Sequence, residues 1–181
     1  MSAKRALWAL MALDPIEAAL RGQREVVIDA SLAADALIGE PARHALAVRF
    51  FTHCDTLGVR LTVPESFPSE ADTAMFQGVA RGRIAAALLP ALLAALDTLV
   101  VTVAREKSEA HAVRVRAREI AAMLNQPGVY DATYAALAER RGCEFWTADK
   151  RFANAANQTR RAPDGTSAPG FPFVRFVGKY K

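Results

Sequence analysis

Short apolar runs and longer helical segments alternate along most of the chain. Runs rich in Val, Ile, Thr or aromatic residues predict buried strands at 26–28, 60–63, 99–103, 144–147 and 173–177. Segments with a helical spacing of apolar positions lie between them, at 32–39, 44–57, 65–81, 84–96, 108–125 and 130–141. Strands that alternate with helices favour a parallel sheet covered on both faces. We therefore expect an α/β fold, a three-layer α/β/α domain with a central, mostly parallel sheet.

Glycine and proline residues mark several of the expected boundaries. Gly58 and Gly142 are expected to end helices. Pro64 suits the first position of the helix over 65–81, because its missing N–H would have no partner there. Pro90 either interrupts or begins the helix over 84–96.

The two ends of the chain differ from its middle. An apolar run over 6–13, stopped by Asp14 and Pro15, predicts an amphipathic helix within an N-terminal helical extension over 1–24. The remaining residues, 25–181, are expected to form a single domain. Within it, 154–170 is rich in Asn, Pro, Gly, Ser and Arg, which predicts a loop, and 171–181 is expected to hold a final strand and a basic tail.

The composition supports one folded domain. The 181 residues are 52% hydrophobic and 23% charged, which excludes the low hydrophobicity of disordered chains. Cys54 and Cys143 form no CxxC pair and no zinc ligand set, so a reducing, cytoplasmic location is expected. The longest apolar run, over 84–96, is shorter than the roughly 20 residues that span a bilayer, so no membrane segment is expected.

The net charge of +4 is distributed unevenly. Residues 141–181 carry eight Lys or Arg residues against three acids. A basic end on a nearly neutral body is compatible with a phosphate-bearing partner. A solvated charged surface explains the same pattern, so charge alone leaves both interpretations open.

Four acids stand at the boundaries of the expected elements. Asp29 ends the first strand, Glu70 lies in the helix after the second strand, Asp131 begins a helix and Asp149 follows a later strand. The carboxyl ends of parallel strands lie along one edge of a sheet, so these side chains are placed to converge. Clustered carboxylates repel one another unless a cation lies between them, and an all-oxygen cluster suits Mg²⁺ or Mn²⁺ better than zinc. Such ions promote hydrolysis of phosphodiester bonds.

Four stretches surround these acids: VVIDASL at 26–32, VPE at 63–65 leading to Glu70, YDATYAALA at 130–138 and WTADKRF at 146–152. In this order they resemble PIN-domain ribonucleases of the VapC toxin type. The resemblance covers about residues 25–156. The last two stretches, with a helix and a strand between them, are its most specific part.

The resemblance implies a PIN fold and a Mg²⁺- or Mn²⁺-dependent endoribonuclease, the toxin of a type II toxin–antitoxin pair. RNA, a cognate antitoxin protein and a second copy in a homodimer are the implied partners. The acidic quartet of the family matches Asp29, Glu70, Asp131 and Asp149 as metal ligands, with Thr147 as the neighbouring hydroxyl. The chain departs from the family in its first 24 residues and in a longer, more basic tail after Asn157.

Each of these residues also has an ordinary structural interpretation. Asp29 is a preferred helix N-cap, and Asp131 in a first helical turn is favourable without any function. Asp149 fits a solvated turn with its basic neighbours, and Thr147 fits an ordinary strand. For the second acid, Glu70 competes with two nearby alternatives, Glu65 and Asp72.

Two other functions remain open at this stage. A PIN-like domain without turnover would serve as an RNA-binding or dimerisation module, and an active one would also suit housekeeping RNA processing. Arg114 and Arg118 share a helix face and are a candidate RNA contact, with a solvated surface as the default. The histidines, His44, His53 and His111, have no ligand spacing to one another.

Overall fold

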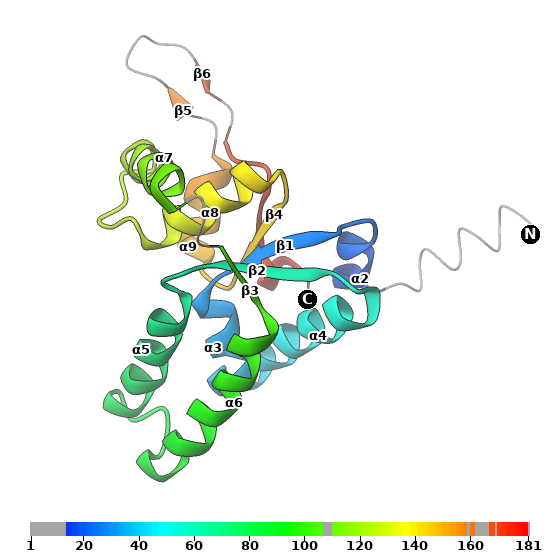
Figure 1. The fold of residues 1–181 in the computed structure, drawn as a ribbon, viewed down its shortest axis with the longest axis vertical. Helices are drawn as coiled ribbons and strands as arrows, with labels where there is room; N and C mark the ends of the chain where they lie inside the picture. The colour runs from blue at the N-terminus through cyan, green and yellow to red at the C-terminus, as the bar shows by residue number, and fades with distance from the viewer. Residues whose placement is uncertain (1–13, 107–109, 159, 162–166, 169, 181) are drawn as a thin grey trace, which may run out of the picture.

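The computed structural model describes residues 14–106, 110–158, 160–161, 167–168 and 170–180. Its centre is a five-stranded sheet with the strand order β3-β2-β1-β4-β7, in which every neighbouring pair is parallel (Figure 1). The strands are β1 (Glu25–Ile28), β2 (Arg60–Pro64), β3 (Ala104–Glu106), β4 (Glu144–Thr147) and β7 (Val174–Phe176). The expected α/β class with a parallel sheet is confirmed.

Helices cover both faces of this sheet (Figure 1). One face carries α2 (Pro15–Leu20), α3 (Ala30–Ile38), α4 (Pro41–Leu57), α5 (Phe67–Ala80) and α6 (Leu89–Thr102). The other carries α7 (Ala110–Met123), α8 (Tyr130–Arg141) and α9 (Lys150–Asn157). Two short 3₁₀ helices, η1 (Ala86–Leu88) and η2 (Val177–Lys179), and a small antiparallel pair, β5 (Arg160–Arg161) with β6 (Ser167–Ala168), complete the described elements.

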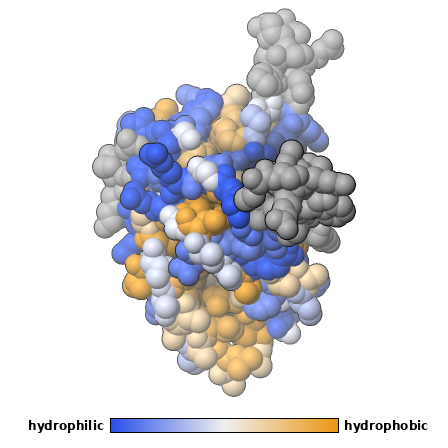
Figure 2. Space-filling model, turned by 90° about the vertical axis from the view of Figure 1, so that its right-hand side faces the viewer, coloured by the Kyte–Doolittle hydropathy of each residue, from blue (hydrophilic) through white to orange (hydrophobic). Residues whose placement is uncertain are grey.

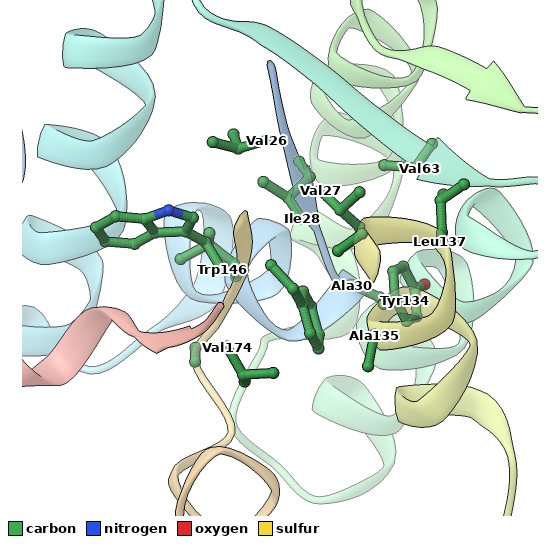
Figure 3. Close-up of a cluster of buried hydrophobic side chains, with 14 of the residues drawn as sticks. Val26, Val27, Ile28, Ala30, Val63, Tyr134, Ala135, Leu137, Trp146 and Val174 are labelled. Atoms are coloured by element: carbon green, nitrogen blue, oxygen red, sulfur yellow. The ribbon is translucent and has the colours of Figure 1, made fainter. Parts of the chain in front are cut away.

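The core divides into two layers because side chains alternate across the strands. On the α8 side, the ring of Phe145 lies 5.8 Å from that of Tyr134 and 5.9 Å from that of Phe152. On the α4 side, Trp146 lies 5.0 Å from Phe50, and Figure 3 shows its indole directed away from Tyr134. Both layers meet at β1, whose Val26, Val27 and Ile28 are fully buried.

Several boundaries were predicted to the residue, and others were wrong. The helix over 130–141 and the strand over 144–147 are α8 and β4. The strand expected at 99–103 is instead the end of α6, which runs to Thr102, and β3 begins only at Ala104. The β-branched run was overridden because the Ala- and Leu-rich segment that begins at Pro90 is a strong helix former, and an established helix extends more readily than a new element begins.

The start of α5 also differs from the expectation. Pro64 does not open a helix, because it is the buried last residue of β2 and pairs in register with Glu106 of β3. Two turn residues follow, and α5 begins at Phe67 with Pro68 in its first turn. The proline rule was sound, but it applied to the next proline along the chain.

The helix expected at 84–96 was misplaced and is far less buried than its sequence suggests. Pro90 lies at the start of α6, not in the middle of a helix, and Leu96 is the one buried residue of α6, all of which is described. Leu88 and Phe76 are each 56% exposed near the α5–α6 connection. Figure 2 shows apolar residues gathered at this lower end of the molecule. Within the described ranges, no helix combines the length and apolarity needed to cross a membrane.

One further expectation, near the C-terminal end of the chain, is corrected. The loop expected over 154–170 begins later, since α9 continues to Asn157 and β5 pairs with β6. The apolar run over 6–13, including Trp8, lies outside the described residues. The next segment, α2, begins at Pro15, and its Ile16 and Leu20 are fully buried in the core that also holds Phe50 of α4.

Replacing Leu96 with Ala tests how α6 is held to the domain. Leu96 is 1% exposed and joins the main core, so its truncation is expected to lower the free energy of unfolding by about 2–5 kcal/mol. Val101 on the same helix is 79% exposed, and Val101→Ala is expected to change it by less than about 0.5 kcal/mol. Urea unfolding measures both. Equal effects of the two variants would contradict this anchoring.

Candidate active site

The candidate site lies at the carboxyl edge of the sheet, between β1 and β4. From β1 the chain proceeds outward through β2 to β3 and then returns to the other side of β1 with β4. This reversal opens a crevice at the strand ends, which is where open parallel sheets bind their ligands. Asp29 follows β1 and Asp149 follows β4. Glu70 and Asp131 lie in the first turns of α5 and α8, whose starts belong to the same edge.

Asp29 is buried and held by several hydrogen bonds. Its side chain is 2% exposed, and Oδ1 accepts from the backbone N–H of Leu32 at 2.9 Å, as an N-cap of α3. The Ser31 hydroxyl lies 2.8 Å from Oδ1 and 2.9 Å from Oδ2. The Thr147 hydroxyl donates to Oδ2 at 2.5 Å. The capping role and a place in the carboxylate cluster therefore coexist in Asp29.

Thr147 and Ser31 join the chain segments that follow β1 and β4. Thr147 is fully buried, and its Oγ1 donates to Asp29 while it accepts from the backbone N–H of Asp149 at 2.9 Å. The Ser31 hydroxyl accepts from the backbone N–H of Ala148 at 3.1 Å. These contacts fix the relative positions of the Asp29 and Asp149 segments. Ser31 lies within a motif noted in the sequence, but its contacts with Asp29 and Ala148 were not predicted.

Thr147→Val is expected to lower the free energy of unfolding by about 1–3 kcal/mol. Valine has the same shape but no hydroxyl, so it leaves Oδ2 of Asp29 and the N–H of Asp149 without this partner. Thr147→Ser keeps the hydroxyl and serves as the control, expected to retain most of the stability. Thermal or urea unfolding gives the comparison, and a valine variant as stable as the wild type would show that the hydroxyl does not hold the two segments.

Glu70 is the acid of its helix that reaches the cluster. Its Oε2 accepts from the Tyr134 hydroxyl at 3.0 Å, while its Oε1 is buried and has no hydrogen-bond partner. Glu65 and Asp72 are exposed. Of these three acids, Glu70 is the one whose charge raises the pKa of Asp131. Tyr134, which positions Glu70, was missed because nothing in the sequence distinguishes it from an ordinary core tyrosine.

The carboxylates perturb one another electrostatically. Burial raises the pKa of Asp29 from 3.8 to about 7, against the hydrogen bonds that lower it, and the charge of Asp131 raises it further. Burial raises the pKa of Asp131 from 3.8 to about 6, with added contributions from Asp149 and Glu70. Burial also raises the pKa of Tyr134, as do the charges of Glu70, Asp29 and Asp131. Asp131 thus interacts with all three other acids.

Asp149 combines a structural role with this cluster. Its Oδ1 accepts from the backbone N–H groups of Arg151 at 2.7 Å and Phe152 at 3.1 Å, which makes it the N-cap of α9. It is partly exposed, and its charge acts on Asp131. The sequence interpretation as a solvated turn is therefore incomplete, because the carboxylate both caps a helix and borders the other acids.

The arrangement suits a hard divalent cation in its donor chemistry. The charged groups that raise the pKa of Asp29 and Asp131 are other carboxylates, so these acids repel one another. Oε1 of Glu70 is a buried oxygen without a partner, as expected of an unused ligand atom. Within the described residues, no three His, Cys, Asp or Glu side chains lie close enough to form a ready-made metal site. The oxygens fit Mg²⁺ or Mn²⁺ once a cation draws them together.

The histidines take no part in the cluster. Nε2 of His53 lies 3.4 Å from Oδ2 of Asp14, which also binds the guanidinium of Arg49. His44 and His111 are exposed.

A parallel sheet with acids at its topological switch point defines an α/β protein with a candidate ligand site at the strand ends. The comparison with protein families makes this specific, because residues 26–158 match the family model of the PIN domain. The chain belongs to the PIN-domain family. Proteins of this family are generally nucleases that depend on metal ions, typically divalent ones. They generally bind RNA.

Comparison with solved structures agrees on the fold. The chain is similar to the protein PAE2754 from Pyrobaculum aerophilum in its crystal structure, with a TM-score of 0.53 and 20% sequence identity. The match covers 72% of this chain and 85% of that one. A search of curated proteins finds no match.

Proposed function

We propose that this protein is a Mg²⁺- or Mn²⁺-dependent endoribonuclease whose ion is held by Asp29, Glu70, Asp131 and Asp149. The observation that carries the proposal is the placement of the four acids at the carboxyl edge of the sheet, where Oε1 of Glu70 is buried without a hydrogen-bond partner. Neighbouring carboxylates that share no cationic side chain are costly to keep. A bound divalent ion removes that cost.

Each protein group has a distinct task in this mechanism. A divalent ion bound here supplies charge neutralisation at the scissile phosphate and an acidified water as nucleophile. Asp29 is kept in one orientation by Leu32, Ser31 and Thr147. Glu70 is oriented by the Tyr134 hydroxyl, and its second oxygen is buried without a hydrogen-bond partner.

A groove lined in part by Asp149 supports the proposal that the substrate is a polyanion. It has a volume of about 580 Å³, includes Ser31 and Asp149 in its lining, and carries basic side chains from α4, from α9 and from the residue that follows α5. These cations are Arg43, Arg81, Lys150 and Arg151, which define the basic groove. Arg43 pairs with Asp35 at 2.8 Å, whereas no ion pair within the described residues engages Arg81, Lys150 or Arg151. Free guanidinium and ammonium groups suit the phosphates of RNA.

The basic end of the chain contributes only in part. Arg141 pairs with Glu25 at 2.9 Å, and Arg175 pairs with Glu144 at 2.5 Å, so both act within the fold. Lys150 and Arg151, at the start of α9, reach the basic groove. We therefore assign the contacts with the RNA phosphate backbone to Lys150, Arg151 and Arg81.

We extend the proposal to a toxin of a type II toxin–antitoxin pair, which acts as a homodimer and is inhibited by an antitoxin protein. The motif resemblance supports this role, and the exposed Leu88 and Phe76 supply apolar surface for a protein partner. Expression of the wild-type chain should arrest growth, and Asp131→Asn should not. Growth unaffected by an active enzyme would favour housekeeping RNA processing.

Cleavage of labelled single-stranded RNA tests the nuclease itself. The wild type is expected to cut with Mg²⁺ or Mn²⁺ and to stop when EDTA is added, while Asp131→Asn loses activity under all conditions. Thermal unfolding should show that the variant folds. If the wild type binds the RNA but does not cut it with any divalent ion, the protein is instead a non-catalytic RNA-binding module.

A further inference from the structure

A second cleft lies at the carboxyl edge of the sheet, on the side of α7 and α8. It is formed where β2 ends and where α7 and α8 pack together, and its volume is about 250 Å³. We call it the base cleft, and its lining residues are Pro64, Glu65, Ser66, Val113, Arg114, Val129, Tyr130, Thr133 and Leu137. Asp149 is part of the lining of the basic groove, and Tyr130 of the base cleft immediately precedes Asp131, so each hollow lies at a segment that carries one of the acids.

The base cleft has an apolar floor and an exposed aromatic rim. Val113 is 5% and Leu137 is 1% exposed, and Pro64 is buried beside them. Tyr130 is 65% exposed, although it immediately precedes Asp131 of the acidic cluster. A tyrosine left open to solvent beside an apolar hollow presents a stacking surface for a flat ligand.

Polar groups at the rim remain available to such a ligand. Arg114 forms no ion pair with any described residue, and it borders the cleft from α7. Ser66 stands at the N-cap position of α5, yet its hydroxyl makes no capping hydrogen bond. The Thr133 hydroxyl donates to the carbonyl of Val129 at 2.7 Å, which leaves its oxygen able to accept. Hydrogen-bonding groups around a flat apolar floor suit a nucleobase.

The size of the cleft favours a single base. Clefts for drug-sized molecules hold roughly 300–1,000 Å³, and this one is smaller. A base paired in a duplex is stacked on both faces and cannot enter, so the ligand must come from a single strand or a loop. The guanidinium of Arg114 at the rim is complementary to the phosphate that accompanies the base.

We propose that the base cleft binds one unpaired nucleobase of the RNA, next to the phosphodiester that the acids address, with the base stacked on Tyr130. The proposal rests on the nuclease function above and adds to it a binding site for one base and a specificity-determining residue, Tyr130. The strand then crosses the site from the base cleft to the basic groove.

The test uses short single-stranded RNAs in which one position at a time lacks its base. For the wild type, removal of one base beside the cleavage site is expected to reduce cleavage by roughly 5- to 150-fold, as expected for the loss of one stacked base. Tyr130→Ala should lose a similar factor on intact RNA and become insensitive to the missing base. Tyr130→Phe should behave as the wild type. Phe76→Ala, which removes a ring that is 56% exposed and lies outside the cleft, is the matched control.

A binding readout separates this proposal from the nuclease function. A fluorescent purine analogue at the same position should lose emission when it binds to Asp29→Asn protein, which cannot cut it, and this loss should vanish with the added Tyr130→Ala change. Arg114→Ala should weaken binding, and Arg118→Ala, which alters a residue outside the cleft, should not. Fluorescence loss without any cleavage by the wild type would refute the nuclease and leave the base cleft standing. Cleavage with no penalty at any missing base, or with a penalty that Tyr130→Ala retains, would overturn the base cleft.

Discussion

Asp29→Asn is expected to reduce divalent-dependent RNA cleavage by roughly 10³-fold or more, because Lewis-acid assistance by a metal is worth several kcal/mol and each 1.36 kcal/mol is tenfold in rate. Asparagine keeps the shape and the Leu32 cap, but it removes the negative charge at the most buried acid of the cluster. The rate of cleavage under saturating Mn²⁺ measures the effect. The control is Asp72→Asn, which alters an exposed acid of α5 outside the site and should leave the rate unchanged.

The same substitution has an opposite effect on the stability of the metal-free protein. The pKa of Asp29 rises from 3.8 to about 7 on folding, so its ionised form opposes folding. The penalty is absent below the unfolded value, grows as the pH rises between the two values and is complete above about pH 7. In EDTA, Asp29→Asn is therefore expected to be at least as stable as the wild type near neutral pH, and to lose this advantage on acidification. A variant that is both fully active and less stable than the wild type would show that Asp29 is not a metal ligand.

Acidification is expected to weaken Mn²⁺ binding strongly. The pKa of Asp29 is about 7 and that of Asp131 about 6, so protons compete with the cation for both carboxylates. If binding requires both in the ionised form, the affinity at about pH 5 is roughly 10³-fold below that at about pH 8. Calorimetric titration at a series of pH values measures the dependence, and the proton uptake or release in different buffers gives the number of protons displaced.

The Asp131→Asn variant provides the matched comparison for this pH dependence. With one titrating ligand removed, the logarithm of the affinity should change less steeply with pH, by about one unit per pH unit at the acidic end instead of about two. An affinity that is constant across this range would mean that neither carboxylate contacts the ion.

The positions of the candidate site residues were predictable from the sequence because these residues lie at the ends of regular elements. Asp29 follows a short β-branched strand, and Asp149 follows β4, whose boundaries were predicted to the residue. The parallel sheet then brings distant strand ends to one edge. The sheet order, with β1 between β2 and β4, explains why these two segments become neighbours.

The remaining features depend on tertiary contacts that no local pattern encodes. Ser31 gains its role from a β4 segment far along the chain, and Tyr134 gains its role from Glu70 on another helix. Residues 99–103 were expected to form a strand because this segment is rich in β-branched residues. In the structure, α6 continues through this segment to Thr102. The weak burial of α6 was equally invisible, since an apolar sequence alone predicts an interior position.

The central claim is that carboxylates distant in sequence jointly hold one divalent cation. Anomalous diffraction from a crystal soaked in Mn²⁺ tests it without any assumption about the substrate. The expected result is a Mn²⁺ peak at bonding distance from the carboxylate oxygens of Asp29 and Asp131, with Glu70 or Asp149 completing the oxygen ligands, and its loss in Asp29→Asn. A peak at another location, or a fully soaked crystal with no peak between these side chains, would contradict the assignment.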